Sequence, residues 1–181
     1  MISLGLDSGS SMTKAVLLED TKIIDTKMIP TSISPRKSLE ALYREIKKQH
    51  KEIDVIVTTG YGRNLLDQAD FKITEITCHA AGAFFMNPDC DTIIDIGGQD
   101  SKVITIDDLG CVESICQRTA AFAQKLAPAN PKVFFSGGLA QFDVIKQSLA
   151  NHLGVKEVAT DSLCQYTGAI GAAVLGIRKI K

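Results

Sequence analysis

Two aspartates stand at the start of matching turns in this sequence. Asp7 lies in "LDSGSSMTKAVLLED" and Asp95 in "IDIGGQDSKVITIDD", which share the order apolar residue, Asp, any residue, Gly, small residue, and then Lys before an aliphatic run. Turns of Gly and Ser leave backbone N–H groups able to converge on an anion. Mg²⁺ prefers a few carboxylates as direct or water-mediated partners. The pair predicts a polyphosphate site whose Mg²⁺ is shared by Asp7 and Asp95, although either motif alone is more simply a hairpin turn.

A third glycine-rich segment, "SGG" at 136–138, follows a buried-type apolar run and is expected to serve the adenosine side of the nucleotide. The residues predicted to contact the nucleotide are Gly9, Ser10, Ser11, Lys14, Gly97, Gly98, Gln99, Gly137 and Gly138. Gln99, Asp7 and Asp95 are the predicted catalytic residues. Gln99, with Asp100 beside it, is placed to orient an attacking water near a γ-phosphate. No P-loop or Rossmann fingerprint occurs.

Two further residues each have two interpretations. Arg63, in "TGYGRN", follows a predicted strand, where loops commonly carry function; it either reaches a phosphate or is a solvated side chain of a glycine-rich turn. His79, in "CHAAGA", is expected to be a hydrogen-bonded packing residue rather than a ligand or a base.

The elements that would position these residues occur twice. The apolar and turn patterns predict strands at 2–7, 13–19, 22–29 and 54–59, helices at 34–50 and 75–86, and a short segment at 71–74. A break at 86–90 is followed by the second hairpin, a helix near 118–127, a strand at 132–136, a helix ending near 152 and a last helix at 165–177. The prediction is an α/β protein of two β-β-β-α-β-α halves, residues 1–88 and 89–181, with a nucleotide cleft between them.

Composition and net charge limit the classes of partner and the cellular location that are expected. A net charge of −1 and a pI near 6.3 argue against nucleic acid as a partner. The longest apolar stretch, "GAIGAAVLGI", is about half of the ~20 residues that a membrane span requires, and no leader pattern opens the chain, so a cytoplasmic protein without a membrane partner is expected. The five cysteines contain no C-x-x-C pair, which predicts reduced thiols without disulfides or zinc.

Several stretches resemble a known family. "LDSGSSMTK", "IDIGGQDSK" and "FFSGGLAQF" resemble the phosphate-1, phosphate-2 and adenosine motifs of the actin, chaperone and sugar-kinase ATPases. Five stretches more closely resemble the ATPase activators of 2-hydroxyacyl-CoA dehydratases and the ATP-binding subunits of benzoyl-CoA reductases: "TTGYGRN", "EITCHAAGA", "DIGGQDSK", "SGGLAQ" and "QYTGAIGAAVLG". The resemblance implies two ribonuclease H-like halves that bind ATP or ADP with Mg²⁺.

The same resemblance implies a homodimer with one [4Fe-4S] cluster at its interface, held by two cysteines from each chain, and a dehydratase or reductase partner that receives an electron. This sequence departs from the family pattern where the cluster ligands are expected, because it runs from the second hairpin directly to the segment before "KVFFSGG". A subdomain is missing there. Cys111 and Cys116 could each supply a ligand in a dimer, but two incidental cysteines on a short strand are the favoured interpretation.

Three classes of function stay open. The first is an ATPase similar to the dehydratase activators, with an altered cluster or none. The second is a nucleotide-binding module with a regulatory role and negligible hydrolysis. The third, ranked last because the chain has no substrate-binding insertion and no spare base for an acceptor hydroxyl, is a small-molecule kinase.

Overall fold

The first sheet gathers the N-terminal strands around β1. The computed structural model describes residues 1–117 and 128–181. Five strands pair in the order β3-β2-β1-β4-β5, in which β1 is antiparallel to β2 and parallel to β4. They are β1 Ile2–Ser8, β2 Met12–Glu19, β3 Lys22–Pro30, β4 Val55–Gly60 and β5 Phe71–Lys72. The predicted hairpin of the first two strands is confirmed.

Helix α1, Pro35–Gln49, connects β3 to β4. Pro35 stands in the first turn, where its missing N–H costs nothing. Leu39, Leu42 and Ile46 recur on one face of the helix, are fully buried and belong to the same core cluster as the strand residues Leu4 and Leu6. The amphipathic pattern of the sequence therefore predicted both the helix and the face that it buries.

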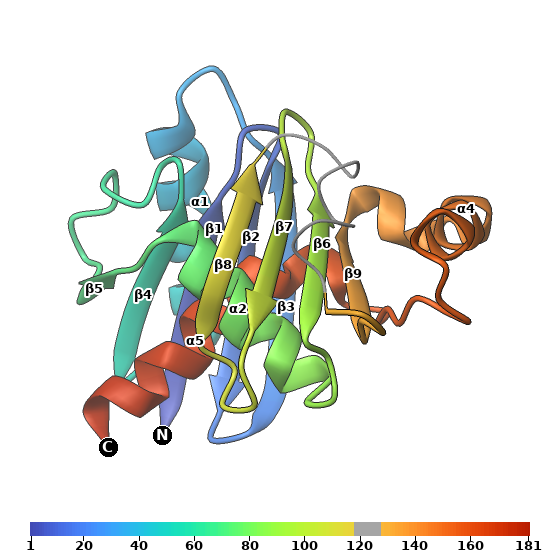
Figure 1. Ribbon diagram of the computed structural model, residues 1–181. Helices are drawn as coiled ribbons and strands as arrows, with labels where there is room; N and C mark the ends of the chain where they lie inside the picture. The colour runs from blue at the N-terminus through green and yellow to red at the C-terminus, as the bar shows by residue number, and fades with distance from the viewer. Residues whose placement is uncertain (118–127) are drawn as a thin grey trace. The chain divides into compact units, whose positions relative to one another are not determined.

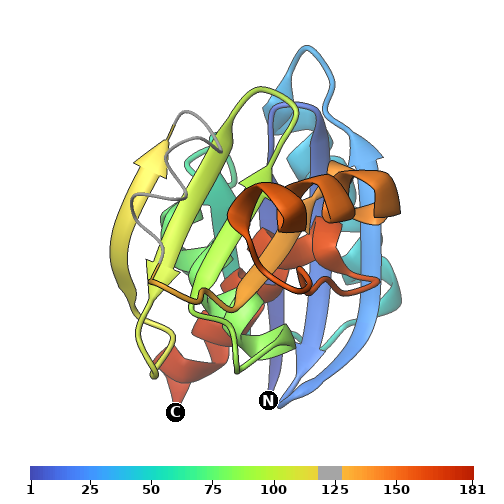
Figure 2. The same ribbon diagram turned by 45° about the vertical axis from the view of Figure 1, so that its right-hand side comes forward.

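The second sheet repeats the first in a shorter form. Its four strands pair in the order β8-β7-β6-β9, with β6 antiparallel to β7 and parallel to β9 (Figure 1, Figure 2). They are β6 Thr92–Ile96, β7 Ser101–Ile106, β8 Val112–Gln117 and β9 Val133–Gly137. Helix α4, Asp143–Leu153, follows the short 3₁₀ turn η2, Gly138–Gln141, and buries Leu149 and Ala150 against β6 and β9 residues.

The predicted α/β architecture of two similar halves is confirmed by these two sheets, since β1-β2-β3-β4 and β6-β7-β8-β9 have the same order and the same directions. Strand and helix bounds agree with the sequence-based ones to within about one residue over most of the chain, and helix α2, Glu75–Met86, agrees fully. The helix predicted near 118–127 lies outside the described residues.

The chain forms two compact units that differ from the predicted halves. Unit 1 contains Met1–Gly82 and Gly168–Lys181, and unit 2 contains Ala83–Thr167. The predicted boundaries, 1–88 and 89–181, thus differ from these units at residues 83–88 and at the last fourteen residues. The expected final helix begins as a 3₁₀ turn, η3 Cys164–Tyr166, and continues as α5, Thr167–Ile180.

Close packing explains why α5 joins unit 1. A Cβ placed on Gly5 of β1 would lie 2.0 Å from the carbonyl oxygen of Ala169, and one on Gly171 of α5 would lie 1.7 Å from the carbonyl oxygen of Cys78 in α2. Real side chains do not approach this closely. Glycine at both positions therefore lets α5 contact strand β1 and helix α2 backbone to backbone. In the part of the chain that the structure describes, no helix is long and apolar enough to cross a bilayer.

Candidate nucleotide-binding site

The hairpin of β1 and β2 places Asp7 directly opposite Lys14. The two residues pair across the strands, and Lys14 Nζ lies 3.7 Å from Asp7 Oδ2. The Gly9 N–H donates to the Met12 carbonyl at 3.2 Å and closes the turn, in which Ser10 is half-buried and Ser11 exposed. Thr31 supports the turn from the end of β3: its N–H donates to the Ser11 carbonyl and its hydroxyl to the Gly9 carbonyl.

The hairpin of β6 and β7 has the same construction. Asp95 pairs with Lys102, whose Nζ lies 3.3 Å from Asp95 Oδ2 and 3.3 Å from Asp100 Oδ1. The Gly97 N–H donates to the Asp100 carbonyl at 2.9 Å, and Gly98 and Gln99 are exposed in the turn. Within each unit, the predicted aspartate, glycine and lysine of one motif therefore lie together.

The strand beside each aspartate adds a second pair of matching residues, which the comparison of the two Asp motifs in the sequence did not include. Asp7 pairs in parallel with Thr59, and Gly60 follows with φ +81°. Asp95 pairs in parallel with Ser136, and Gly137 follows with φ +93°. A Cβ on Gly60 would lie 2.6 Å from Asp7 Oδ1 and one on Gly137 would lie 2.2 Å from the Ile96 carbonyl oxygen, so both positions require glycine. "TTG" at 58–60 is thus the structural counterpart of "FSG" at 135–137.

The two aspartates differ in how their oxygens are paired. Asp95 accepts a hydrogen bond on each oxygen, from the Ser136 hydroxyl and from Lys102. Asp7 is 3% exposed, and its Oδ1 has no hydrogen-bond partner among the described residues. A buried carboxylate oxygen without a partner is costly unless a cation or water fills the position. Asp7 is therefore the better fit for Mg²⁺, which would be bound directly or through water.

Arg63 is hydrogen-bonded within its own loop. Its Nη1 donates to the Gly60 carbonyl at 3.2 Å, and the Thr58 hydroxyl donates to the Arg63 carbonyl. These bonds hold the "TGYGR" loop in place next to Ser8, whose carbonyl accepts from the Gly62 N–H. The phosphate contact of Arg63 stays a prediction.

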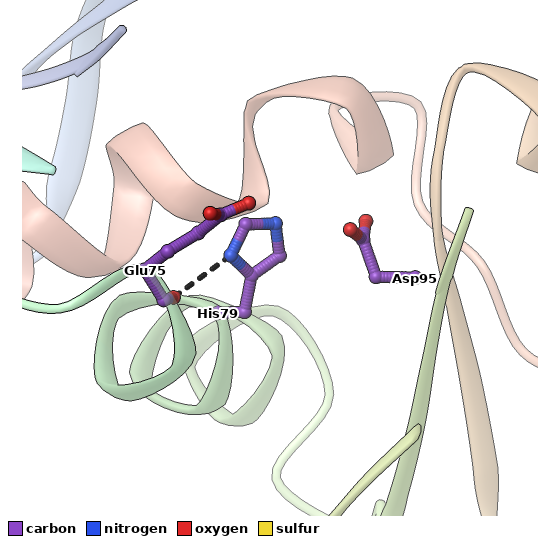
Figure 3. Close-up of side chains that lie close together, drawn as sticks. All are labelled: Glu75, His79 and Asp95. Atoms are coloured by element: carbon purple, nitrogen blue, oxygen red, sulfur yellow. Dashed lines mark hydrogen bonds between the residues drawn. The ribbon is translucent and has the colours of Figure 1, made fainter. Parts of the chain in front are cut away.

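His79 is buried on α2, as expected for a packing residue. Its Nδ1 lies 2.9 Å from the Glu75 carbonyl oxygen one turn earlier (Figure 3). Since a carbonyl oxygen only accepts, Nδ1 carries a proton. The sequence contained a signal that could have raised the rank of this histidine, since Glu75 and His79 are four residues apart and therefore share one helix face.

Among the described residues, no group of three or more metal-ligating side chains that lie close together includes a cysteine. Cys111 is exposed and held in a turn, where its N–H and that of Leu109 donate to Asp107 Oδ1. It precedes β8, in which Cys116 pairs with Val103. Cys78, Cys90 and Cys164 are buried, and we derive no electron transfer through a cluster.

Comparison with known proteins places the chain in a group of ATPases. Residues 4–115 match the model of the BadF/BadG/BcrA/BcrD ATPase family. The activator of lactoyl-CoA dehydratase from Anaerotignum propionicum is 41% identical over 117 residues, which cover 62% of this chain but only 45% of that relative. YjiL of Escherichia coli strain K12 is 28% identical over 249 residues, covering 97% of both proteins.

A solved structure has the same fold. The activator of 2-hydroxyisocaproyl-CoA dehydratase from Clostridium difficile, with bound ADPNP, matches 99% of this chain with a TM-score of 0.81 at 24% identity. The alignment with YjiL is 249 positions long although this chain has 181 residues. At least 68 of its positions therefore have no residue here, in agreement with a missing segment.

Proposed function

Because the chain belongs to the BadF/BadG/BcrA/BcrD ATPase family, we propose that it binds ATP with Mg²⁺ and hydrolyses it slowly. The observation that carries this proposal is the unpartnered, buried Oδ1 of Asp7 next to a hairpin turn of Gly and Ser. A carboxylate that is already desolvated and fixed by Lys14 on its other oxygen offers a preformed position for a hydrated dication.

The proposed roles follow the pairing of each residue. Backbone N–H groups of the two hairpin turns, Gly9 to Ser11 and Gly97 to Gln99, bind phosphate oxygens as anion-binding turns do. Asp7 holds Mg²⁺, which neutralises charge on the phosphates when it is bound. Each carboxylate oxygen of Asp95 accepts a hydrogen bond, one from Lys102 and one from Ser136, so Asp95 acts by orienting that lysine. Gln99 is exposed in its turn and orients the attacking water.

Relatives named as activators of dehydratases support a protein partner of the dehydratase or reductase type. A homodimer is also proposed, by analogy with that family. A second candidate is a nucleotide-binding module that regulates a partner without useful turnover. The observation that favours it is the length difference from YjiL, since at least 68 aligned positions are absent from this chain.

Calorimetry tests the binding step. ATP is titrated into the parent protein and into Asp7→Asn, Asp95→Asn and Asp108→Asn, each with and without Mg²⁺. Asp108 is an exposed turn residue and serves as the matched control. We expect Asp7→Asn to lose the Mg²⁺-dependent part of the affinity, by at least about tenfold, since a direct or water-mediated cation contact is removed. Equal Mg²⁺-dependent affinity in Asp7→Asn and Asp108→Asn would refute the proposal.

Steady-state hydrolysis separates the two candidates. We expect slow turnover of MgATP by the isolated protein, and we expect Gln99→Ala to reduce kcat with little change in KM, because water orientation matters in the transition state rather than in binding. Tight ATP binding with turnover that Gln99→Ala leaves unchanged would favour the regulatory module instead.

A further inference from the structure

Thr31 follows strand β3 and makes three hydrogen bonds at the hairpin turn of β1 and β2. Its N–H donates to the Ser11 carbonyl at 2.9 Å, and its hydroxyl donates to the Gly9 carbonyl at 2.8 Å. Its hydroxyl oxygen also lies 2.9 Å from that of Thr13. A carbonyl oxygen only accepts and a hydroxyl has one proton, so Thr31 uses its proton on Gly9 and Thr13 is the donor in the third bond.

The Thr31 hydroxyl lies on the face of the first sheet that helix α1 covers. Side chains along a strand alternate between the two faces of the sheet. Leu6 and Ile29 pack in the core cluster that contains the buried residues of α1, so Asp7, the neighbour of Leu6, faces the other way. Thr31 stands two residues beyond Ile29, and its hydroxyl contacts that of Thr13, which pairs with Ile29. The side chains of Thr31 and Asp7 are therefore on opposite faces.

This placement determines where the backbone donor of the turn points. The peptide between Gly9 and Ser10 is trans, and a planar trans peptide directs its C=O and its N–H in opposite directions. The Gly9 carbonyl is held by Thr31 on the α1 face, so the N–H of the same peptide, which belongs to Ser10, points toward the other face. Asp7 and its partner Lys14 lie on that face.

The Ser10 N–H is not used within the described part of the chain. The Gly9 N–H is bonded to the Met12 carbonyl at 3.2 Å, whereas no described residue accepts a hydrogen bond from the Ser10 N–H. Ser10 is half-buried, so its backbone is within reach of a ligand. Backbone N–H groups presented by a turn bind anions.

Helix α1 in turn holds the segment that carries Thr31. The Ser38 hydroxyl, on α1, accepts from the Ser32 N–H at 2.8 Å and lies 3.0 Å from the Ser32 hydroxyl. Ser38 is 5% exposed, so these bonds are shielded from water. Thr31 is thus attached to a helix through the next residue of the chain and reaches the turn with its side chain.

We propose that Thr31 is a positioning residue of the nucleotide site, which holds the Gly9 carbonyl on the α1 face and so aims the Ser10 N–H at a phosphate oxygen. The inference rests on the proposed binding of ATP and identifies a backbone donor that acts there. Thr31 does not touch the nucleotide itself. Because an N–H binds phosphate without the cation, this contribution is present with and without Mg²⁺, unlike that of Asp7.

The test measures the affinities of ATP and of adenosine by calorimetry, with and without Mg²⁺, in the parent and in Thr31→Val, Thr31→Ser and Thr26→Val. Valine has the shape of threonine without the hydroxyl, and serine keeps the hydroxyl. Thr26 is the matched control, since it is half-buried on the same strand and its hydroxyl makes no hydrogen bond to the described residues. Thermal unfolding shows whether each variant is folded.

We expect Thr31→Val to weaken ATP at least about fivefold, by the same factor with and without Mg²⁺, because hydrogen bonds to charged acceptors are among the strongest in proteins. Adenosine has no phosphate, so its affinity should not change. Thr31→Ser should bind ATP as the parent does. In ¹H–¹⁵N spectra the Ser10 amide proton should move downfield when ATP binds to the parent, and should move less in Thr31→Val.

Equal ATP affinity in folded Thr31→Val and Thr26→Val would refute the inference. An equal loss of adenosine and ATP affinity would also refute it, as would a Thr31→Ser protein that binds ATP no better than Thr31→Val. If Thr31→Val does not fold, Thr31→Ala takes its place with Thr26→Ala as the control, because alanine removes the hydroxyl without setting a methyl group against the Gly9 carbonyl.

The outcomes separate this inference from the proposed function. A parent protein that binds no ATP would refute both. If Asp7→Asn loses the Mg²⁺-dependent affinity while Thr31→Val keeps its full affinity for ATP, the proposed function stands and only the role of Thr31 is wrong.

Discussion

At the scale of single residues, Asp7 and Asp95 have the same sequence context and different pairing. The repeated Asp, Gly and Lys predicted two similar hairpins, and the structure pairs Asp7 with Lys14 and Asp95 with Lys102 across the strands. What the repeat could not predict is the residue on the parallel neighbour. Ser136 donates to Asp95, whereas the buried Thr59 hydroxyl makes no hydrogen bond with any described residue. Asp7 Oδ1 therefore receives no hydrogen bond from its parallel neighbour.

The cysteines differ in their reactivity toward alkylating reagents. Burial raises the pKa of Cys78 to about 12 and that of Cys90 to about 11. At pH 8 roughly one Cys78 thiol in ten thousand is ionised, and only the thiolate reacts. We expect iodoacetamide to label Cys111 in the folded protein within minutes and to label Cys78 and Cys90 only after denaturation. Peptide mass spectrometry measures this, and fast labelling of Cys78 in the native protein would contradict it.

The same two thiols make stability depend on alkaline pH. The pKa of each is raised in the folded state above its ordinary value of 9.0, so the folded protein retains a proton that the unfolded chain loses. This contribution to stability is complete below about pH 9 and is lost as the pH rises toward 11 and 12. Urea unfolding from pH 8 to 10.5 should show a steeper fall for the parent than for Cys78→Ala, by up to about 1.4 kcal/mol per pH unit. Parallel slopes would contradict the prediction.

At the scale of elements, the small residues of α5 are a packing device. The Gly and Ala residues of "TGAIGAAVLG" permit a close approach to another element, but the sequence alone does not say which one, because Gly and Ala are compatible with any tight contact. The structure shows the partners: β1 at Gly5 and α2 at Gly171. The Asn, Pro and Asp near residue 88 predicted a boundary there, whereas the compact units divide between Gly82 and Ala83, and residues 168–181 return to unit 1.

Substitution of Gly171 tests this contact. A Cβ there would lie 1.7 Å from the Cys78 carbonyl oxygen, so backbone must move in Gly171→Ala. Overpacking of this kind costs typically 1–3 kcal/mol and occasionally more, and we expect a loss of at least about 2 kcal/mol in the free energy of unfolding. Gly138→Ala is the control, because nothing lies within 4 Å of its added Cβ. Similar unfolding curves for the two variants would show that the helix contact is not as tight as described.

At the scale of the whole molecule, the two sheets repeat one topology, and family membership agrees with this. Both Asp hairpins and both glycine turns are present, while at least 68 positions of the YjiL alignment have no residue in this chain.

Iron analysis tests whether the chain binds a cluster. We expect protein purified without oxygen to contain far less than one iron per chain and to lack the broad visible absorption of an iron–sulfur cluster, because no cysteine of the described residues belongs to a group of metal-ligating side chains. Cys111→Ser should leave the spectrum unchanged. A value near two iron atoms per chain that falls in Cys111→Ser would show that this thiol is a ligand.

The contact between Gly5 and Ala169 has a consequence for the order in which the protein is made. The two residues are 164 positions apart in the sequence. At a ribosome speed of about 5–20 residues per second, the cover of strand β1 is synthesised roughly 8 to 33 s after the strand itself. During that interval the face of β1 that helix α5 covers in the folded protein has no partner, so unit 1 cannot complete its core until the last residues of the described chain are made.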